Sequence, residues 1–182
     1  LHRSGHSFPT RRSSDLVRYP GTWTVVTTAN TTRGVFLRNP FNAEENLFVN
    51  CSSPSSSNYS SVRDLGSPED AAKGVIDRYL NEFMSTRLGI RRESEIVRAG
   101  EREGKDGRLY YDVAVRIRSF AASNQYGLTQ QERPQTLEWD RTQLASFGVE
   151  NKRLYELRIQ VPSSKYTTDE GQLQEILDSF EL

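Results

Sequence analysis

The sequence predicts an α+β fold in which a central antiparallel β-sheet is flanked by helices. Three observations indicate this class. Side chains in residues 109–118 alternate in the way that strands with two different faces do. Turn-forming residues lie between the later strands, which predicts hairpins, and an amphipathic helix interrupts the run of strands. A repeating strand–helix unit, which would build a parallel sheet, is not found.

The first third of the chain predicts three short strands. Residues 22–28 are β-branched and aromatic and follow the Tyr-Pro-Gly turn at residues 19–21. Residues 34–38 and 46–51 are the second and third strands. Residues 52–61 are almost all Ser, Asn and Pro, so we expect a mobile loop there.

The clearest helix is predicted to begin at Ser67 and Pro68. Ser67 is a favourable N-cap, Pro68 suits the first turn, and the acids that follow complement the positive end of the helix. Gly89 is a plausible stop. One apolar stripe at helical spacing is expected to pack in the core: Ala72, Val75, Ile76, Tyr79, Leu80, Phe83 and Met84.

The remaining elements are predicted as strands and one last helix. Residues 94–103 and 109–118 form a hairpin, and we expect 109–118 to have one buried and one wet face. Strands are also expected at residues 136–140 and 153–161, with Pro162 as the end. The helix is predicted from Thr168 to Phe180, because Thr167 and Glu170 have capping-box spacing.

Two segments are distinguished along the chain. Residues 6–16 read like the in-frame translation of a common sequencing-library adapter. We therefore expect residues 1–16 to be a disordered, non-native tail and residues 17–182 to be a single, N-terminally truncated domain. The alternative is a natural basic, Ser-rich tail.

Composition excludes several classes of function. The charges balance, with 24 basic and 24 acidic residues, which argues against nucleic-acid binding, and no apolar run is long enough to cross a bilayer. The only cysteine is Cys51, and both histidines lie in residues 1–16, so a catalytic triad or a zinc site is not expected. Glu101, Glu103 and Asp106 near a turn could bind calcium weakly, but they lack EF-hand spacing. We expect a monomeric, non-enzymatic protein without a certain cofactor.

Three stretches of the sequence occur in the order found in one known family. They are residues 18–23, residues 65–69 with 107–112, and residues 151–157 with 160–162 and 178–180. Together they resemble the PsbP family, the extrinsic lumenal proteins of photosystem II and their paralogues. Residues 81–94 resemble the paralogous PsbP-domain proteins more than the subunit of the oxygen-evolving complex itself.

This resemblance implies a sheet sandwiched by helices, similar to the Ran-binding Mog-type fold. It also implies a location in the chloroplast thylakoid lumen, peripheral to the membrane, and a role in photosystem assembly or stability. Photosystem subunits or assembly intermediates would be the partners. Calcium binding is implied at the family level only, because the histidine that some members use for metal binding has no counterpart in residues 17–182.

We expect any partner surface to include Arg91 and Arg92, which we place in a turn, and a polar loop with Asn124, Gln125 and Arg133. Exposed loops on a rigid sheet are where binding residues collect. The alternative is a small-ligand-binding protein or an enzyme that reuses the fold, which a deep pocket with converging carboxylates would favour. A cofactor that grips a nucleotide-free GTPase is a weaker option, resting on fold analogy alone.

Overall fold

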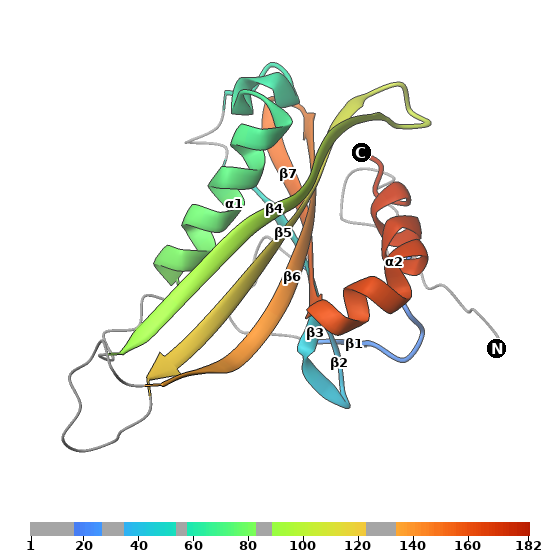
Figure 1. The fold of residues 1–182 in the computed structure, drawn as a ribbon. Coiled ribbons are helices and arrows are strands. Elements are labelled where there is room, and N and C mark those ends of the chain that lie inside the picture. Colours follow the sequence, from blue (N-terminus) through green and yellow to red (C-terminus); the bar gives the residue numbers. More distant parts are fainter. Residues whose placement is uncertain (1–16, 27–34, 54–57, 83–88, 123–133) are drawn as a thin grey trace.

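Seven strands form one antiparallel sheet with a helix on each face (Figure 1), which confirms the predicted class. The computed structural model describes residues 17–26, 35–53, 58–82, 89–122 and 134–182. The predicted tail of residues 1–16 therefore lies outside the described part. The strands are ordered β1-β2-β3-β7-β6-β5-β4 across the sheet. They are β1 (Thr24–Val25), β2 (Val35–Asn39), β3 (Asn42–Cys51), β4 (Ile90–Glu103), β5 (Leu109–Ala122), β6 (Gln135–Glu150) and β7 (Arg153–Pro162).

Two apolar cores lie on the two faces of the sheet. Helix α1 (Pro68–Glu82), preceded by the short 3-10 helix η1 (Val62–Leu65), covers β4 and β5. Helix α2 (Ser163–Asp178) covers β6 and β7 on the opposite face. The α1-side core contains Val62, Ala71, Ala72, Val75, Tyr111, Val113, Val115, Ala145 and Phe147. The α2-side core includes Leu37, Leu47, Tyr110, Ala114, Leu144, Leu157, Ile159, Leu173, Leu177 and Phe180. Among the described residues, neither helix is long and apolar enough to span a membrane.

The prediction that strand β5 has one wet face is wrong for its first half. Tyr110 and Ala114 are both fully buried, although they face away from α1. The reason is that α2, which is far away in the sequence, packs over this face. Only Arg116 and Arg118, further along the strand, are partly exposed as the alternation predicted.

Several strand boundaries differ from the prediction. Strand β6 continues ten residues beyond the predicted end at Asp140, because residues 142–148 are buried on both faces and lack the alternation that marks a half-exposed strand. Strand β4 begins at Ile90, so Arg91 and Arg92 lie in a strand and the predicted turn is wrong. Strand β3 begins at Asn42, four residues before its predicted start.

The start of α1 is confirmed and the start of α2 is not. Ser67 Oγ accepts from the Asp70 backbone N–H at 3.2 Å, and Asp70 Oδ2 accepts in return from the Ser67 N–H at 3.2 Å, a reciprocal cap. Helix α2 starts at Ser163, directly after β7. The Thr167 hydroxyl donates back to the Ser163 carbonyl at 3.3 Å, so it does not cap, and the helix is kinked at Asp169.

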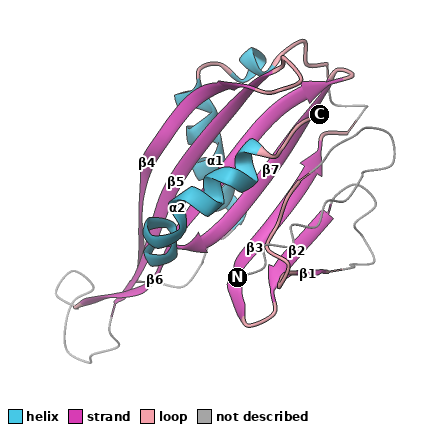
Figure 2. Ribbon diagram, turned by 90° about the vertical axis from the view of Figure 1, so that its right-hand side faces the viewer, coloured by secondary structure: helices cyan, strands magenta, loops and turns pink. Residues whose placement is uncertain are grey.

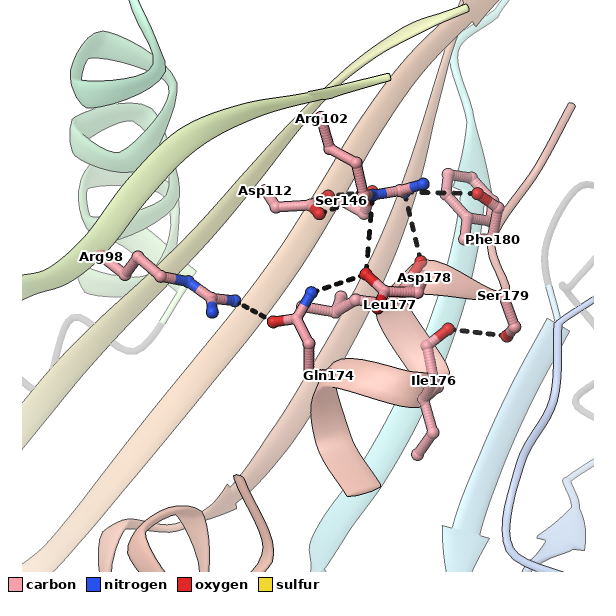
Figure 3. Close-up of polar contacts among 10 residues, drawn as sticks. All are labelled: Arg98, Arg102, Asp112, Ser146, Gln174, Ile176, Leu177, Asp178, Ser179 and Phe180. Atoms are coloured by element: carbon pink, nitrogen blue, oxygen red, sulfur yellow. Dashed lines mark hydrogen bonds and ion pairs between the residues drawn. The ribbon is translucent and has the colours of Figure 1, made fainter. Parts of the chain in front are cut away.

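Arg102 of β4 ties the C-terminal end of α2 to the sheet (Figure 3). Its Nε atom donates to Asp112 Oδ2 at 2.7 Å, and its Nη2 atom donates to the carbonyl oxygens of Leu177 and Phe180 at 3.2 and 3.4 Å. Ser146 Oγ donates to the other Asp112 oxygen at 2.6 Å. The guanidinium therefore adds a donor to the carbonyls at and just beyond the end of the helix and sits at the negative end of the helix dipole.

Tyr110 lies opposite Arg102 on β5 and fixes the turns at this same end of the strands. Its hydroxyl donates to Asp106 at 2.8 Å and accepts from the Leu182 N–H at 2.8 Å. The buried ring leaves room only for glycine beside it. A Cβ atom on Gly148 would lie 2.6 Å from the Tyr110 ring, and one on Gly104 would lie 2.7 Å from it.

Replacing Gly148 with Ala should therefore destabilise the domain, whereas replacing Gly74 with Ala should stabilise it. The new methyl group at Gly148 meets a fully buried ring, and we expect the free energy of unfolding to fall by about 1–3 kcal/mol. At Gly74, inside α1, a Cβ meets nothing within 4 Å, and we expect a gain of about 0.5–1 kcal/mol. Urea unfolding measures both; equal effects at the two positions would contradict the packing around Tyr110.

Arg102→Ala should lower the free energy of unfolding more than a surface substitution does. It leaves the Asp112 carboxylate, whose side chain is 8% exposed, without its cation. We expect a loss of roughly 3–5 kcal/mol in the free energy of unfolding. The Arg102→Ala/Asp112→Ala double variant should lose less than the sum of the two single variants. Strict additivity in this cycle would show that the pair is not coupled.

Candidate partner-binding surface

Helix α2 leaves part of its side of the sheet uncovered. It crosses the sheet obliquely, and the ends of β4, β5 and β6 extend beyond it (Figure 2). Residues that alternate with the α1-side core point to this face, as Tyr110 and Ala114 do under α2. We call the uncovered part the open sheet face. It consists of Arg91, Glu93 and Glu95 of β4, Arg116, Arg118 and Phe120 of β5, and Leu137 and Asp140 of β6.

Charged side chains of opposite sign form a ladder across the open sheet face. Cross-strand pairing places Glu93 opposite Arg118 and Glu95 opposite Arg116, with charged atoms 3.4 and 3.5 Å apart. Arg116 is also paired with Asp140 at 2.5 Å. Three arginines and three carboxylates balance, so the face carries no net charge. Because exposed ion pairs contribute little stability, most of these groups can change partner at small cost.

Arg91 is the most exposed cation of this ladder. Its side chain is 58% exposed and contacts Glu93 at 2.9 Å. Its guanidinium lies 4.9 Å from the centre of the Phe120 ring, a cation–π contact that orients the group. A guanidinium has five N–H donors, so donors remain for another molecule. Leu137, which is paired with Phe120, is 54% exposed and adds an apolar patch beside it.

The structure separates the two arginines that the sequence grouped together. Consecutive strand residues point to opposite faces, so Arg91 lies on the open sheet face and Arg92 on the α1 side, opposite Ser119. Arg92 is half-buried. The predicted residues Asn124, Gln125 and Arg133 lie outside the described residues.

The sequence did not single out the residues that surround Arg91 on the open sheet face. Glu93, Glu95, Phe120 and Leu137 belong to three strands, and nothing in their spacing indicates that they meet. The one available signal was the alternation in β5, which placed Arg116 and Arg118 on a wet face. Their carboxylate partners follow from strand order, which local sequence patterns do not encode.

A cavity of about 490 Å³ lies where the open sheet face meets the first turn of α2. Its lining residues are Glu95, Val97, Arg116, Asp140, Thr142, Ser163, Ser164, Tyr166 and Thr167. The buried Ser163 hydroxyl donates to Asp140 at 2.5 Å and lies 2.9 Å from the Thr142 hydroxyl. Hydrogen bonds from Arg116 and Ser163 hold the pKa of Asp140 below its ordinary value, although burial of the carboxylate opposes this effect. Asp140 is therefore an ionised structural carboxylate, because a general base needs a pKa close to the working pH.

The described residues contain no group of three or more His, Cys, Asp or Glu side chains that could hold a metal ion. The acidic residues near the β4–β5 turn have other partners. Glu101 is paired with Arg63 at 3.6 Å, and Asp106 with Arg108 at 2.8 Å.

Comparisons with known proteins agree with the sequence motifs. A model of the PsbP family matches residues 16–182. The chain is 47% identical over 163 residues to the chloroplastic PsbP domain-containing protein 1 of Arabidopsis thaliana. That match covers 90% of this chain and 56% of the relative, so the chain spans little more than half of the relative's length.

Solved structures confirm the fold at low sequence identity. The solution structure of the cyanobacterial PsbP (CyanoP) of Synechocystis matches with a TM-score of 0.69 and 19% identity, over 100% of this chain and 94% of that one. The crystal structure of the Ran-binding protein Mog1p of Saccharomyces cerevisiae matches with a TM-score of 0.55 and 11% identity, over 99% and 96%. At these identities the matches show the shared sandwich architecture alone.

Asp140→Asn should destabilise the protein in a pH-dependent way. The folded protein depresses the pKa of Asp140 below 3.8, so its contribution is complete at neutral pH and is lost as the carboxylate becomes protonated. We expect a difference of about 1–2 kcal/mol between the two proteins at pH 7. It should stay constant down to about pH 5 and shrink below that. Unfolding at several pH values tests this, and a difference that widens in acid would contradict it.

Proposed function

The chain belongs to the PsbP family, and we propose that it is a non-enzymatic extrinsic protein of the chloroplast thylakoid lumen. In this proposal it supports photosystem assembly or stability by binding photosystem subunits or assembly intermediates. Its similarity to a chloroplastic PsbP domain-containing protein supports the compartment. It also supports the role of a paralogue over that of the oxygen-evolving subunit.

The open sheet face is the observation that carries a binding role. This face lies beyond the covering helix and has alternating charges, an oriented arginine and an exposed leucine. Such a composition is typical of a transient protein interface, in which polar groups surround a small apolar patch. Its balanced charges suit a partner surface with both signs of charge. Charges in such a surface set the partner and its orientation more than the affinity.

The alternative, a small-ligand-binding protein or an enzyme, has less support. The cavity beside α2 is the feature that would favour it. Its carboxylate Asp140 is held ionised by Arg116 and Ser163, whereas catalytic carboxylates that act as acids have raised pKa values. The other acidic group of the lining, Glu95, is about half exposed.

Arg91→Ala should weaken association with thylakoid membranes stripped of their extrinsic proteins. We expect the dissociation constant in co-sedimentation to rise about threefold to tenfold, and the binding of the unchanged chain to be lost at high salt. Arg92→Ala should bind as the unchanged chain does, because Arg92 lies on the α1 side. The free energy of unfolding should change by less than about 1 kcal/mol for Arg91→Ala.

Arg63→Ala is the matched control. Arg63 is also an exposed arginine with one carboxylate partner, Glu101, but it lies in η1 on the α1 side. Equal weakening by Arg63→Ala and Arg91→Ala would indicate a general charge effect. Unchanged binding of Arg91→Ala would remove the open sheet face from consideration.

A further inference from the structure

Phe41 stands at the tip of the β2–β3 hairpin. Strand β2 ends at Asn39 and β3 begins at Asn42, so Pro40 and Phe41 form the tip. The Phe41 side chain is 90% exposed, more than any other large apolar residue that the structure describes. Single exposed apolar residues are common on protein surfaces, so exposure alone assigns no role. The way the tip is held carries the argument.

Two asparagines fix the backbone on either side of Phe41. Asn39 Oδ1 accepts from the Phe41 backbone N–H at 3.0 Å, and Asn42 Oδ1 accepts from the Glu44 N–H at 3.1 Å. The side-chain amide groups of both asparagines donate to the carboxylate of Glu45, at 2.9 and 3.0 Å. One carboxylate therefore joins both sides of the tip.

Glu45 connects this arrangement to helix α2. It is only 5% exposed, and Lys165 in the first turn of α2 lies 2.6 Å from its Oε2 atom. A buried carboxylate requires such a partner. The network holds the tip rigidly against α2, yet the ring that it positions remains in solvent. A ring held in this way loses little conformational freedom on binding, since only its two side-chain torsions remain to be fixed.

We propose that Phe41 is the apolar anchor of the partner interface and inserts into a pocket of a membrane protein, a conclusion that rests on the proposed function. Anchors of this type are aromatic side chains that fill a pocket and are ringed by polar contacts. The first turn of α2 connects the hairpin to the open sheet face, because Lys165 contacts Glu45 at 2.6 Å and Ser163 donates to Asp140 at 2.5 Å. One partner can therefore contact both features.

A protein pocket fits the tip better than a lipid bilayer does. Stable attachment to a membrane takes two anchoring signals, such as a lipid chain with a basic patch, and the tip offers one ring. Arg141 and Lys165 near the tip are paired with Glu44 and Glu45, and Arg38 is the single exposed cation of the hairpin. The tip therefore lacks the excess of basic side chains that attracts anionic lipids.

Photo-crosslinking tests which molecule the ring contacts. Phe41 is replaced by the photoreactive analogue p-benzoylphenylalanine in the full 182-residue chain, which is irradiated with stripped thylakoid membranes. The control places the same analogue at Lys105, an exposed residue of the β4–β5 turn. We expect an adduct with a photosystem or assembly protein from position 41 only, which an excess of the unchanged chain abolishes and an excess of Phe41→Ala does not. A lipid adduct alone, or no adduct, would overturn the proposal.

Binding of Phe41→Ala gives the second readout. Because the side chain is exposed, thermal unfolding should be unchanged, while the dissociation constant for stripped membranes should rise about tenfold or more. If Arg91→Ala weakens binding and Phe41→Ala does not, the proposed function stands and the anchor is wrong. If the unchanged chain neither sediments with the membranes nor forms an adduct from position 41, both are wrong. A position-41 adduct with a protein unrelated to photosystems would support the pocket and overturn the proposed function.

Discussion

The Arg102 guanidinium is the contact on which the arrangement of the sandwich depends. It lies between strand β4 and the last turn of α2 and bonds to Asp112 on one side and to the Leu177 and Phe180 carbonyls on the other. A single cation thereby neutralises a buried carboxylate and caps a helix. Apolar packing alone would hold α2 against the sheet, but it is not directional. The hydrogen bonds of Arg102 fix where the helix ends on the sheet.

The position of α2 decides which part of the sheet is available for binding. With its C-terminal end held at Arg102 and its first turn held through Ser163 and Lys165, the helix covers β6 and β7 and leaves the ends of β4–β6 open. The same first turn supports Glu45 and so the hairpin that presents Phe41. The two surfaces proposed to contact a partner are therefore positioned by one helix, at the same end of the sheet (Figure 1).

The candidate site could be predicted only in part. The sequence indicates a surface position for Arg91, but it groups Arg92 with it because it suggests a turn where strand β4 begins. Phe41 was not identified, because a Pro-Phe pair beside asparagines reads as an ordinary turn. Its significance comes from Glu45 and from Lys165, which is 120 residues away. Hydrogen bonds over such a separation leave no periodic signal in the sequence.

The fold class and most elements can be predicted from the amino-acid sequence, and three sequence motifs indicate the family. Local signals are sufficient for the elements: the Ser67 cap, the apolar stripe of α1 and the alternation of β5 and β7 depend on neighbours a few residues apart. Which faces of the sheet are covered depends on how the helices pack in the folded protein. Tyr110 and Ala114 look like the wet side of a strand until α2 packs over them, and Arg116 and Arg118 on the same side stay accessible because the helix does not reach them. Whether a strand residue is buried depends on which distant segments of the chain pack against it, and the alternation of a strand carries no information about that.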